Sequence, residues 1–188
     1  MNKCHRYLNL PFEIKPLSHF DEERDIIQHN YLYNAFEFPE LYNWMNNLGV
    51  ELYMGETFYT PPYSKIPIHT DHSGYTNHVK INVTWGPQEG VTQWWKSDSI
   101  KSESTYKHGG MEIGENSLIP HLWAEEEDCE LLYEANTNRP SLVNVGILHG
   151  TNNPTSEGRW TLSFIPRKGE RYVHWDDAID IFKDYLDK

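Results

Sequence analysis

The stretch from Ser141 to Arg167, SLVNVGILHGTNNPTSEGRWTLSFIPR, predicts two buried β-strands joined by a polar turn. Its first half, LVNVGIL, is rich in β-branched and aliphatic residues, which favour strands, and it ends at His149-Gly150. Asn, Pro, Thr, Ser and Gly follow, and these residue types favour turns. His149 is therefore expected at the mouth of a strand, facing a loop.

The second half of the stretch alternates polar and large apolar side chains. The polar residues are Arg159, Thr161 and Ser163, and the apolar ones are Trp160, Leu162 and Phe164. Successive side chains of a strand point to opposite faces, so the three polar side chains share one face. A guanidinium with hydroxyls beside it suits a carboxylate ligand. We expect the strand of Arg159 to run beside the strand that delivers His149.

Other parts of the chain are also rich in strand-like segments separated by polar or Pro- and Gly-containing stretches. These segments are VELYMGETFYT (50–60), HVKINVTW (78–85), VTQWW (91–95) and CELLYEA (129–135), with a weaker edge strand over 7–14. Many short strands with turn signals between them predict a mainly β sandwich or barrel. The polar segment 96–127 between two of these strands is expected to be an insertion loop.

Three helices are expected around the strands. DEERD followed by IIQHNYL predicts a helix within 18–33, because acidic residues favour the positive end of a helix dipole. Pro39 at a first turn, apolar residues at helical spacing and Gly49 as the stop predict a second helix. WDDAIDIFKDYLDK predicts an amphipathic helix over 175–188.

The composition is acidic and rich in aromatic residues and histidine. The 188 residues include 28 acidic and 16 basic ones, which gives a formal net charge of −12. A duplex phosphate backbone would be repelled, so nucleic acid is not expected as a partner. Ten histidines, seven tryptophans and twelve tyrosines are typical of a protein with a pocket for small molecules or peptides.

The length fits one domain over residues 1–188. Cys4 and Cys129 form no CxxC pair, and no secretory signal or long apolar run is present, so no membrane association is expected. These features predict a soluble protein of the reducing cytoplasm.

A candidate metal site follows from a His-x-Asp pair. The pattern occurs three times, but His19-Asp21 and His174-Asp176 stand at expected helix starts, where a structural role explains them. His69-Thr70-Asp71 instead ends an extended segment, so the side chains of His69 and Asp71 point the same way. His149 supplies a third ligand. Two imidazoles and one carboxylate on strand ends form a facial triad, which leaves positions open on iron(II).

These residues resemble the iron(II)- and 2-oxoglutarate-dependent dioxygenase superfamily: HTD, then LHG, then R-x-T ten residues after the histidine. The segment HTDHSGYTNHVKINV resembles both the prolyl-hydroxylase-like and the aspartyl/asparaginyl-hydroxylase-like branches. The resemblance implies a double-stranded β-helix, a jelly roll or cupin-like barrel, over 50–167, with supporting helices in 1–49 and 175–188.

By position, the resemblance makes His69, Asp71 and His149 the iron ligands. It makes Arg159 the partner of the far carboxylate of 2-oxoglutarate, with Thr161 as the hydroxyl partner where serine is usual. His72, directly after Asp71, is an alternative ligand, because the aspartyl-hydroxylase-like motif would place one there. Further candidates for a substrate or co-substrate pocket are Lys80, Asn82, Ser163 and Trp95.

The implied reaction is hydroxylation of an unactivated C–H bond with O2, coupled to decarboxylation of 2-oxoglutarate to succinate. The substrate would be a small molecule or a protein residue, and segment 96–127 is the candidate lid. Lys80 and Asn82 fit either a solvated strand face or a polar barrel interior. Two other classes stay open: a cupin-like metal enzyme of another reaction type, and a non-catalytic jelly-roll binding module.

Overall fold

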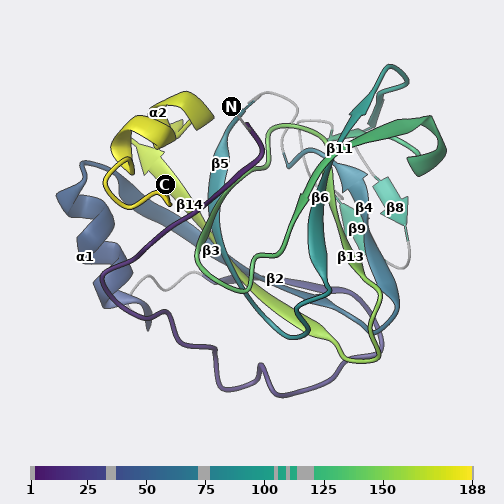
Figure 1. The fold of residues 1–188 in the computed structure, drawn as a ribbon, viewed down its shortest axis with the longest axis horizontal. Coiled ribbons are helices and arrows are strands. Elements are labelled where there is room, and N and C mark those ends of the chain that lie inside the picture. The colour runs from purple at the N-terminus through teal and green to yellow at the C-terminus, as the bar shows by residue number, and fades with distance from the viewer. Residues whose placement is uncertain are drawn as a thin grey trace.

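The computed structural model of the chain describes residues 3–32, 37–71, 77–103, 106–108, 111–113 and 121–187. Two antiparallel β-sheets face each other and enclose an interior, with two helices against the outside of one sheet (Figure 1). The predicted mainly β jelly roll with flanking helices is confirmed.

The first sheet carries the helices. Its strand order is β1-β12-β5-β14-β3-β2, with β15 paired to β14. The bounds are β1 His5–Tyr7, β12 Ser141–Asn144, β5 Val79–Trp85, β14 Arg159–Lys168, β3 Glu51–Thr60, β2 Gln28–Leu32 and β15 Arg171–Tyr172.

The second sheet lies on the opposite side of the interior. Its strand order is β11-β6-β13-β4-β10-β7. The bounds are β11 Cys129–Ala135, β6 Val91–Ser97, β13 His149–Asn153, β4 Ser64–His69, β10 His121–Trp123 and β7 Lys101–Glu103. A separate pair joins β8 Tyr106–His108 to β9 Met111–Ile113, and a 3-10 turn, Glu126–Asp128, precedes β11.

The main hydrophobic core lies between the first sheet and the two helices, α1 Pro39–Asn47 and α2 Trp175–Ile181. The outward-facing residues of β5 and β14 meet helix residues there: Val79, Ile81, Val83, Leu162 and Phe164 against Leu41, Trp44, Met45, Ala178 and Phe182. Strand alternation explains the arrangement, because every second residue of these strands is apolar.

The alternate residues of β5 and β14 line the interior, and they are polar. Ser163 Oγ donates to Asn82 Oδ1 at 2.7 Å, and the Oγ1 atoms of Thr84 and Thr161 are 2.8 Å apart. Lys80, on the same face of β5, is only 5% exposed. The alternation of Lys80 and Asn82 therefore marks a polar barrel interior and not a solvated strand face.

The helix expected within 18–33 is absent, since residues 18–32 contain loop and the edge strand β2. The acidic residues there bind the sheet instead of starting a helix. Glu23 accepts hydrogen bonds from the Tyr59 hydroxyl and from the Gly158 backbone N–H (3.2 Å). Trp160 Nε1 donates to the Glu22 carbonyl oxygen at 3.0 Å. Tertiary contacts thus override the local helix signal.

The other two helices differ less from expectation. The helix from Pro39 is confirmed as α1, and Gly49 follows it at φ +76°, a left-handed conformation that glycine adopts easily. The C-terminal helix ends at Ile181 and does not continue to 188. The last residues instead pair with the N-terminal segment through a bridge between Leu8 and Leu186.

The strand expected over 142–148 is broken. β12 ends at Asn144, whose Oδ1 accepts a hydrogen bond from the Gly146 N–H at 3.2 Å, and the chain then crosses to the second sheet. A Cβ at Gly146 would lie 2.7 Å from the backbone nitrogen of His78, so this turn requires glycine. His149 consequently begins β13 instead of ending the preceding strand.

Two further predictions, for residues 7–14 and for segment 96–127, differ from the structure in where strands lie. The edge strand expected over 7–14 is not formed there: of these residues only Tyr7 belongs to a strand, β1 His5–Tyr7, which pairs at the sheet edge with β12. Segment 96–127 is not a plain loop, because its described parts contain β7 and β10, which extend the second sheet beyond β4. Its role as a lid stays a prediction.

Candidate metal centre

The two histidines of the centre stand on neighbouring strands of the second sheet. His69 is the last residue of β4 and lies opposite His149, the first residue of β13. The Nδ1 atoms are hydrogen-bonded to backbone carbonyl oxygens, His69 to Pro67 at 2.7 Å and His149 to Ile147 at 2.9 Å. An Nδ1–H that donates to a carbonyl leaves Nε2 with its lone pair, the state a metal ligand requires.

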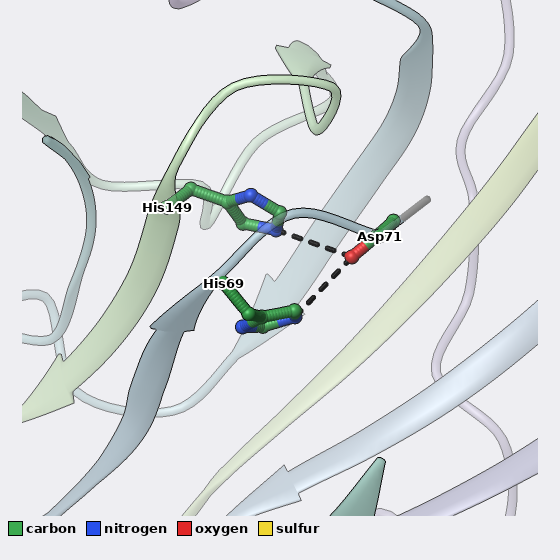
Figure 2. Close-up of side chains that lie close together, drawn as sticks. All are labelled: His69, Asp71 and His149. Carbon is green, nitrogen blue, oxygen red and sulfur yellow. Dashed lines mark ion pairs between the residues drawn. The ribbon is translucent and has the colours of Figure 1, made fainter. Parts of the chain in front are cut away.

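Asp71 completes the group. Its Oδ1 lies 3.3 Å from His69 Nε2 and 3.4 Å from His149 Nε2, so all three side chains converge on one point (Figure 2). The ligand atoms of the three residues lie within 4.8 Å of one another, and no other such group of histidine, cysteine or acidic residues occurs in the described part of the chain. The three residues that the sequence predicts to form one metal site thus lie together in the fold.

The protonation states suit a divalent cation. Burial alone would raise the pKa of the Asp71 carboxyl, but its contacts, chiefly the one with the Lys80 ammonium, outweigh burial and hold this pKa well below its usual range. An ionised carboxylate and two imidazoles with free Nε2 atoms are a donor set that iron(II) and similar metals accept. The residues present therefore fit such an ion.

Lys80 links the centre to a second buried carboxylate. Its Nζ lies 2.6 Å from Asp71 Oδ2 and also forms an ion pair with Glu56, whose other oxygen lies 3.6 Å from His29 Nε2. Burial alone would lower the pKa of Lys80, but the two carboxylates outweigh burial and raise it. Sequence reasoning missed Glu56, although this acid in the middle of β3, whose other residues after Glu51 are apolar or hydroxyl-bearing, was a usable signal.

Arg159 begins β14 and is 2% exposed. Among the described residues no carboxylate pairs with it, and its Nε has no hydrogen-bond partner. Burial lowers the pKa of the guanidinium to about 10. The hydroxyl of Thr161, on the same strand face, lies in a chain of threonine hydroxyls with Thr84 and Thr137.

The strand of Arg159 does not run beside the strand of His149, contrary to expectation. β14 lies between β5 and β3 in the first sheet, whereas β13 lies between β4 and β6 in the second. The guanidinium and the histidines are thus contributed by opposite sheets. The polar turn crosses between sheets because Asn153 Nδ2 donates to the carbonyl oxygens of Pro61 and Glu157, both at 2.8 Å.

The remaining candidates lie apart from this centre or outside the described residues. Trp95 packs in a separate cluster with Ile68, Ala124 and Leu148, while its neighbour Trp94 is fully buried and donates from Nε1 to the Asn144 carbonyl oxygen at 2.8 Å. His72 lies outside the described residues. Within the described chain, no helix combines the length and apolar character that crossing a membrane requires.

No protein-family model matches the chain, and no curated protein does. Several solved structures are similar to the chain at low identity. A non-heme monooxygenase, ThoJ, in complex with nickel is 15% identical, with a TM-score of 0.35 over 67% of this chain; the chain spans only 49% of that protein. AviO1 from Streptomyces viridochromogenes Tue57 is 14% identical, with a TM-score of 0.46 over 90% of this chain and 76% of AviO1. HygX from Streptomyces hygroscopicus, with nickel and 2-oxoglutarate bound, is 13% identical, with a TM-score of 0.40 over 77% of this chain and 70% of HygX. Similarities this distant carry no functional argument, which has to come from the site itself.

Proposed function

We propose that this protein is an iron(II)- and 2-oxoglutarate-dependent oxygenase that hydroxylates a C–H bond of a small molecule or a protein residue. The observation that supports this most is the pairing of a His-Asp-His centre with a buried guanidinium that has no anionic partner among the described residues. A buried cation without a partner is costly unless a ligand supplies the missing anion.

His69, Asp71 and His149 would hold the metal from one side. All three offer their ligand atoms from strand ends or just beyond, and each histidine is oriented by its Nδ1 hydrogen bond. A three-residue set on one face leaves other coordination positions open for a chelating co-substrate and oxygen. When bound, iron(II) would supply the activation of O2 that is coupled to decarboxylation of 2-oxoglutarate to succinate.

Arg159 would bind the carboxylate of 2-oxoglutarate that is remote from the metal. It stands on the interior face of the first sheet, opposite the histidines, with the Thr161 hydroxyl on the same face. A guanidinium holds a carboxylate through two parallel N–H donors, which fixes both position and orientation. The protein's own contribution is therefore to orient the co-substrate and to limit water in the interior.

The two alternative functions do not explain why the guanidinium of Arg159 is buried. A cupin-like enzyme of another reaction type would use the metal ligands without a buried guanidinium, and a binding module would need neither. The experiment that separates them is an anaerobic titration of the iron(II) protein with 2-oxoglutarate, following the metal-to-ligand absorption band, in the wild type and in Arg159→Ala.

The loss of a buried charge-assisted contact costs ~2–5 kcal/mol, so Arg159→Ala should bind 2-oxoglutarate tens- to thousands-fold more weakly. Its iron affinity should stay close to that of the wild type. Equal dissociation constants for 2-oxoglutarate in the two proteins would exclude this role of Arg159 and favour the alternatives.

A further inference from the structure

Lys80 forms a bridge between the metal centre and Glu56. Its ammonium contacts Asp71 Oδ2 at 2.6 Å and Glu56 Oε2, and both Lys80 and Glu56 are 5% exposed. The Phe58 ring, 5.7 Å from the ammonium, covers another side of it. Lys80, Glu56 and Phe58 all lie on the interior face of the first sheet.

The bridge fixes the orientation of Asp71. Because Lys80 holds Oδ2, the other oxygen of Asp71 faces the Nε2 atoms of both histidines. A carboxylate held in this way offers one oxygen to a metal and not two. Lys80, however, also places a positive charge next to the position of a divalent cation, and like charges in a poorly solvated interior repel strongly.

Glu56 removes this disadvantage. Its carboxylate pairs with Lys80 and cancels the lysine charge, so that Asp71 keeps its full negative charge for the metal. His29, 3.6 Å from Glu56, is 29% exposed at the sheet edge and lies on the far side of this chain of contacts. The buried Glu56, Lys80 and Arg159, together with Asp71, whose side chain is 17% exposed, carry no net charge.

We propose that Lys80 and Glu56 form a charge-balancing pair, in which Lys80 orients Asp71 for binding through one oxygen and Glu56 tunes the metal affinity without touching the metal. The inference rests on the metal site of the proposed function. It makes Glu56 and Lys80 positioning residues whose removal shifts metal affinity in opposite directions.

The opposite direction of the two shifts distinguishes this role from a purely structural ion pair. Glu56→Gln keeps the shape but leaves the Lys80 charge uncompensated, so Co²⁺ should bind about tenfold more weakly or worse. Lys80→Met removes the repulsion and leaves two carboxylates, so Co²⁺ should bind about tenfold more tightly. The double variant Glu56→Gln/Lys80→Met restores the balance and should bind within about threefold of the wild type.

The experiment is an anaerobic titration of each full-length variant with CoCl2, following the visible absorption of the bound ion. Lys80→Met and the double variant should also show an altered Co²⁺ spectrum, because Asp71 is then free to bind through both oxygens. Glu126→Gln is the matched control, because its carboxylate forms a 2.6 Å pair with Lys65 at 53% and 50% exposure, away from Asp71. It should bind Co²⁺ like the wild type.

Thermal unfolding of each apoprotein identifies any variant that fails to fold. If Lys80→Met fails to fold, the comparison of Glu56→Gln with the double variant still tests the proposal. A Co²⁺ affinity that recovers in the double variant supports the charge-balancing pair. An affinity that is equally weak in both variants overturns it. Unchanged Co²⁺ affinity in Glu56→Gln also overturns it while leaving the proposed function intact. A wild type that binds no Co²⁺ at the histidines would instead overturn the metal site and this inference with it.

Discussion

Gly90 lies against the guanidinium of Arg159. A Cβ built at Gly90 would come within 2.7 Å of Arg159 Cζ and closer still to its Nε and Cδ. The glycine therefore leaves the space that the buried guanidinium occupies, and any larger residue would have to displace it. Gly90 precedes β6 in the second sheet, so the position of Arg159 depends on both sheets.

Gly90→Ala is accordingly expected to weaken 2-oxoglutarate binding by about tenfold or more while leaving metal affinity unchanged, because a shifted guanidinium loses its two-donor geometry. The anaerobic 2-oxoglutarate titration measures this effect. Gly169→Ala is the control: Gly169 has φ +60° and no atom within 4 Å of a built Cβ. It should cost ~1 kcal/mol of stability without changing 2-oxoglutarate affinity, and a Gly90→Ala protein that binds like this control would contradict the prediction.

The second prediction concerns the type of cation at position 159. Arg159→Lys keeps a positive charge but loses the planar fork, so its 2-oxoglutarate affinity should fall between those of the wild type and Arg159→Ala. The same titration gives all three dissociation constants. Full affinity in the lysine variant would mean that charge alone suffices, and that the burial of the guanidinium has another cause.

The third prediction concerns the metal ligands. His69→Ala and His149→Ala should each abolish one-to-one iron(II) binding, because two ligands do not hold the ion in one position. Asp71→Asn should weaken iron(II) binding more than the substitution of a surface carboxylate does. Both the buried Lys80 and the metal lose the anion that they share. Metal content after anaerobic dialysis and equilibrium titration are the measurements.

His72→Ala tests the alternative assignment directly. If His72→Ala loses iron(II) and His69→Ala retains it, His72 is the ligand in place of His69. The far-ultraviolet circular dichroism spectrum of each variant should match that of the wild type, which separates loss of the metal from loss of the fold.

The fourth prediction is a dependence of stability on pH that comes from His5. This residue is 3% exposed and contacts the rings of Tyr7 and Tyr133, and its Nε2 has no hydrogen-bond partner among the residues that the structure describes. Burial lowers the pKa of its imidazole from 6.5 to about 4. The unfolded chain therefore binds a proton near pH 6.5 that the folded chain rejects until about pH 4.

It follows that His5 contributes nothing unfavourable above pH 6.5 and destabilises the fold progressively as the pH falls toward 4. The loss should approach roughly 2–4 kcal/mol, at about 1.4 kcal/mol per pH unit. Urea unfolding of the wild type and of His5→Phe at pH 7, 6, 5 and 4 measures it. The free-energy difference between the two proteins should shift in favour of His5→Phe as the pH falls, and a constant difference would rule the effect out.

Much of the centre follows from local sequence alone. His69 and Asp71 are two residues apart at the end of an extended segment, and this spacing by itself points both side chains the same way. The period of two in RWTLSF placed Arg159, Thr161 and Ser163 on one face, and the structure puts that face inside the barrel. Helix α1 followed from Pro39, its apolar spacing and Gly49, all of which act within a single element.

The tertiary structure decided what depends on residues distant in the sequence. The break between Asn144 and His149 arises because Gly146 passes close to the backbone of Asn77 and His78, and no period in LVNVGIL contains that contact. DEERD failed as a helix start because Glu23 is bound by Tyr59 and Gly158, 36 and 135 residues away in the sequence.

The same limit explains Glu56 and Gly90. Neither carries a motif, and each acquires its role only when the first sheet sets Glu56 against Lys80 or when the two sheets bring Gly90 to Arg159. Periodicity tells which face of a strand a side chain occupies. The packing of the two sheets decides which strand of the other sheet that face meets. The grouping of His69, Asp71 and His149 could thus be predicted from the sequence, whereas the charges and spaces around these residues required the folded barrel.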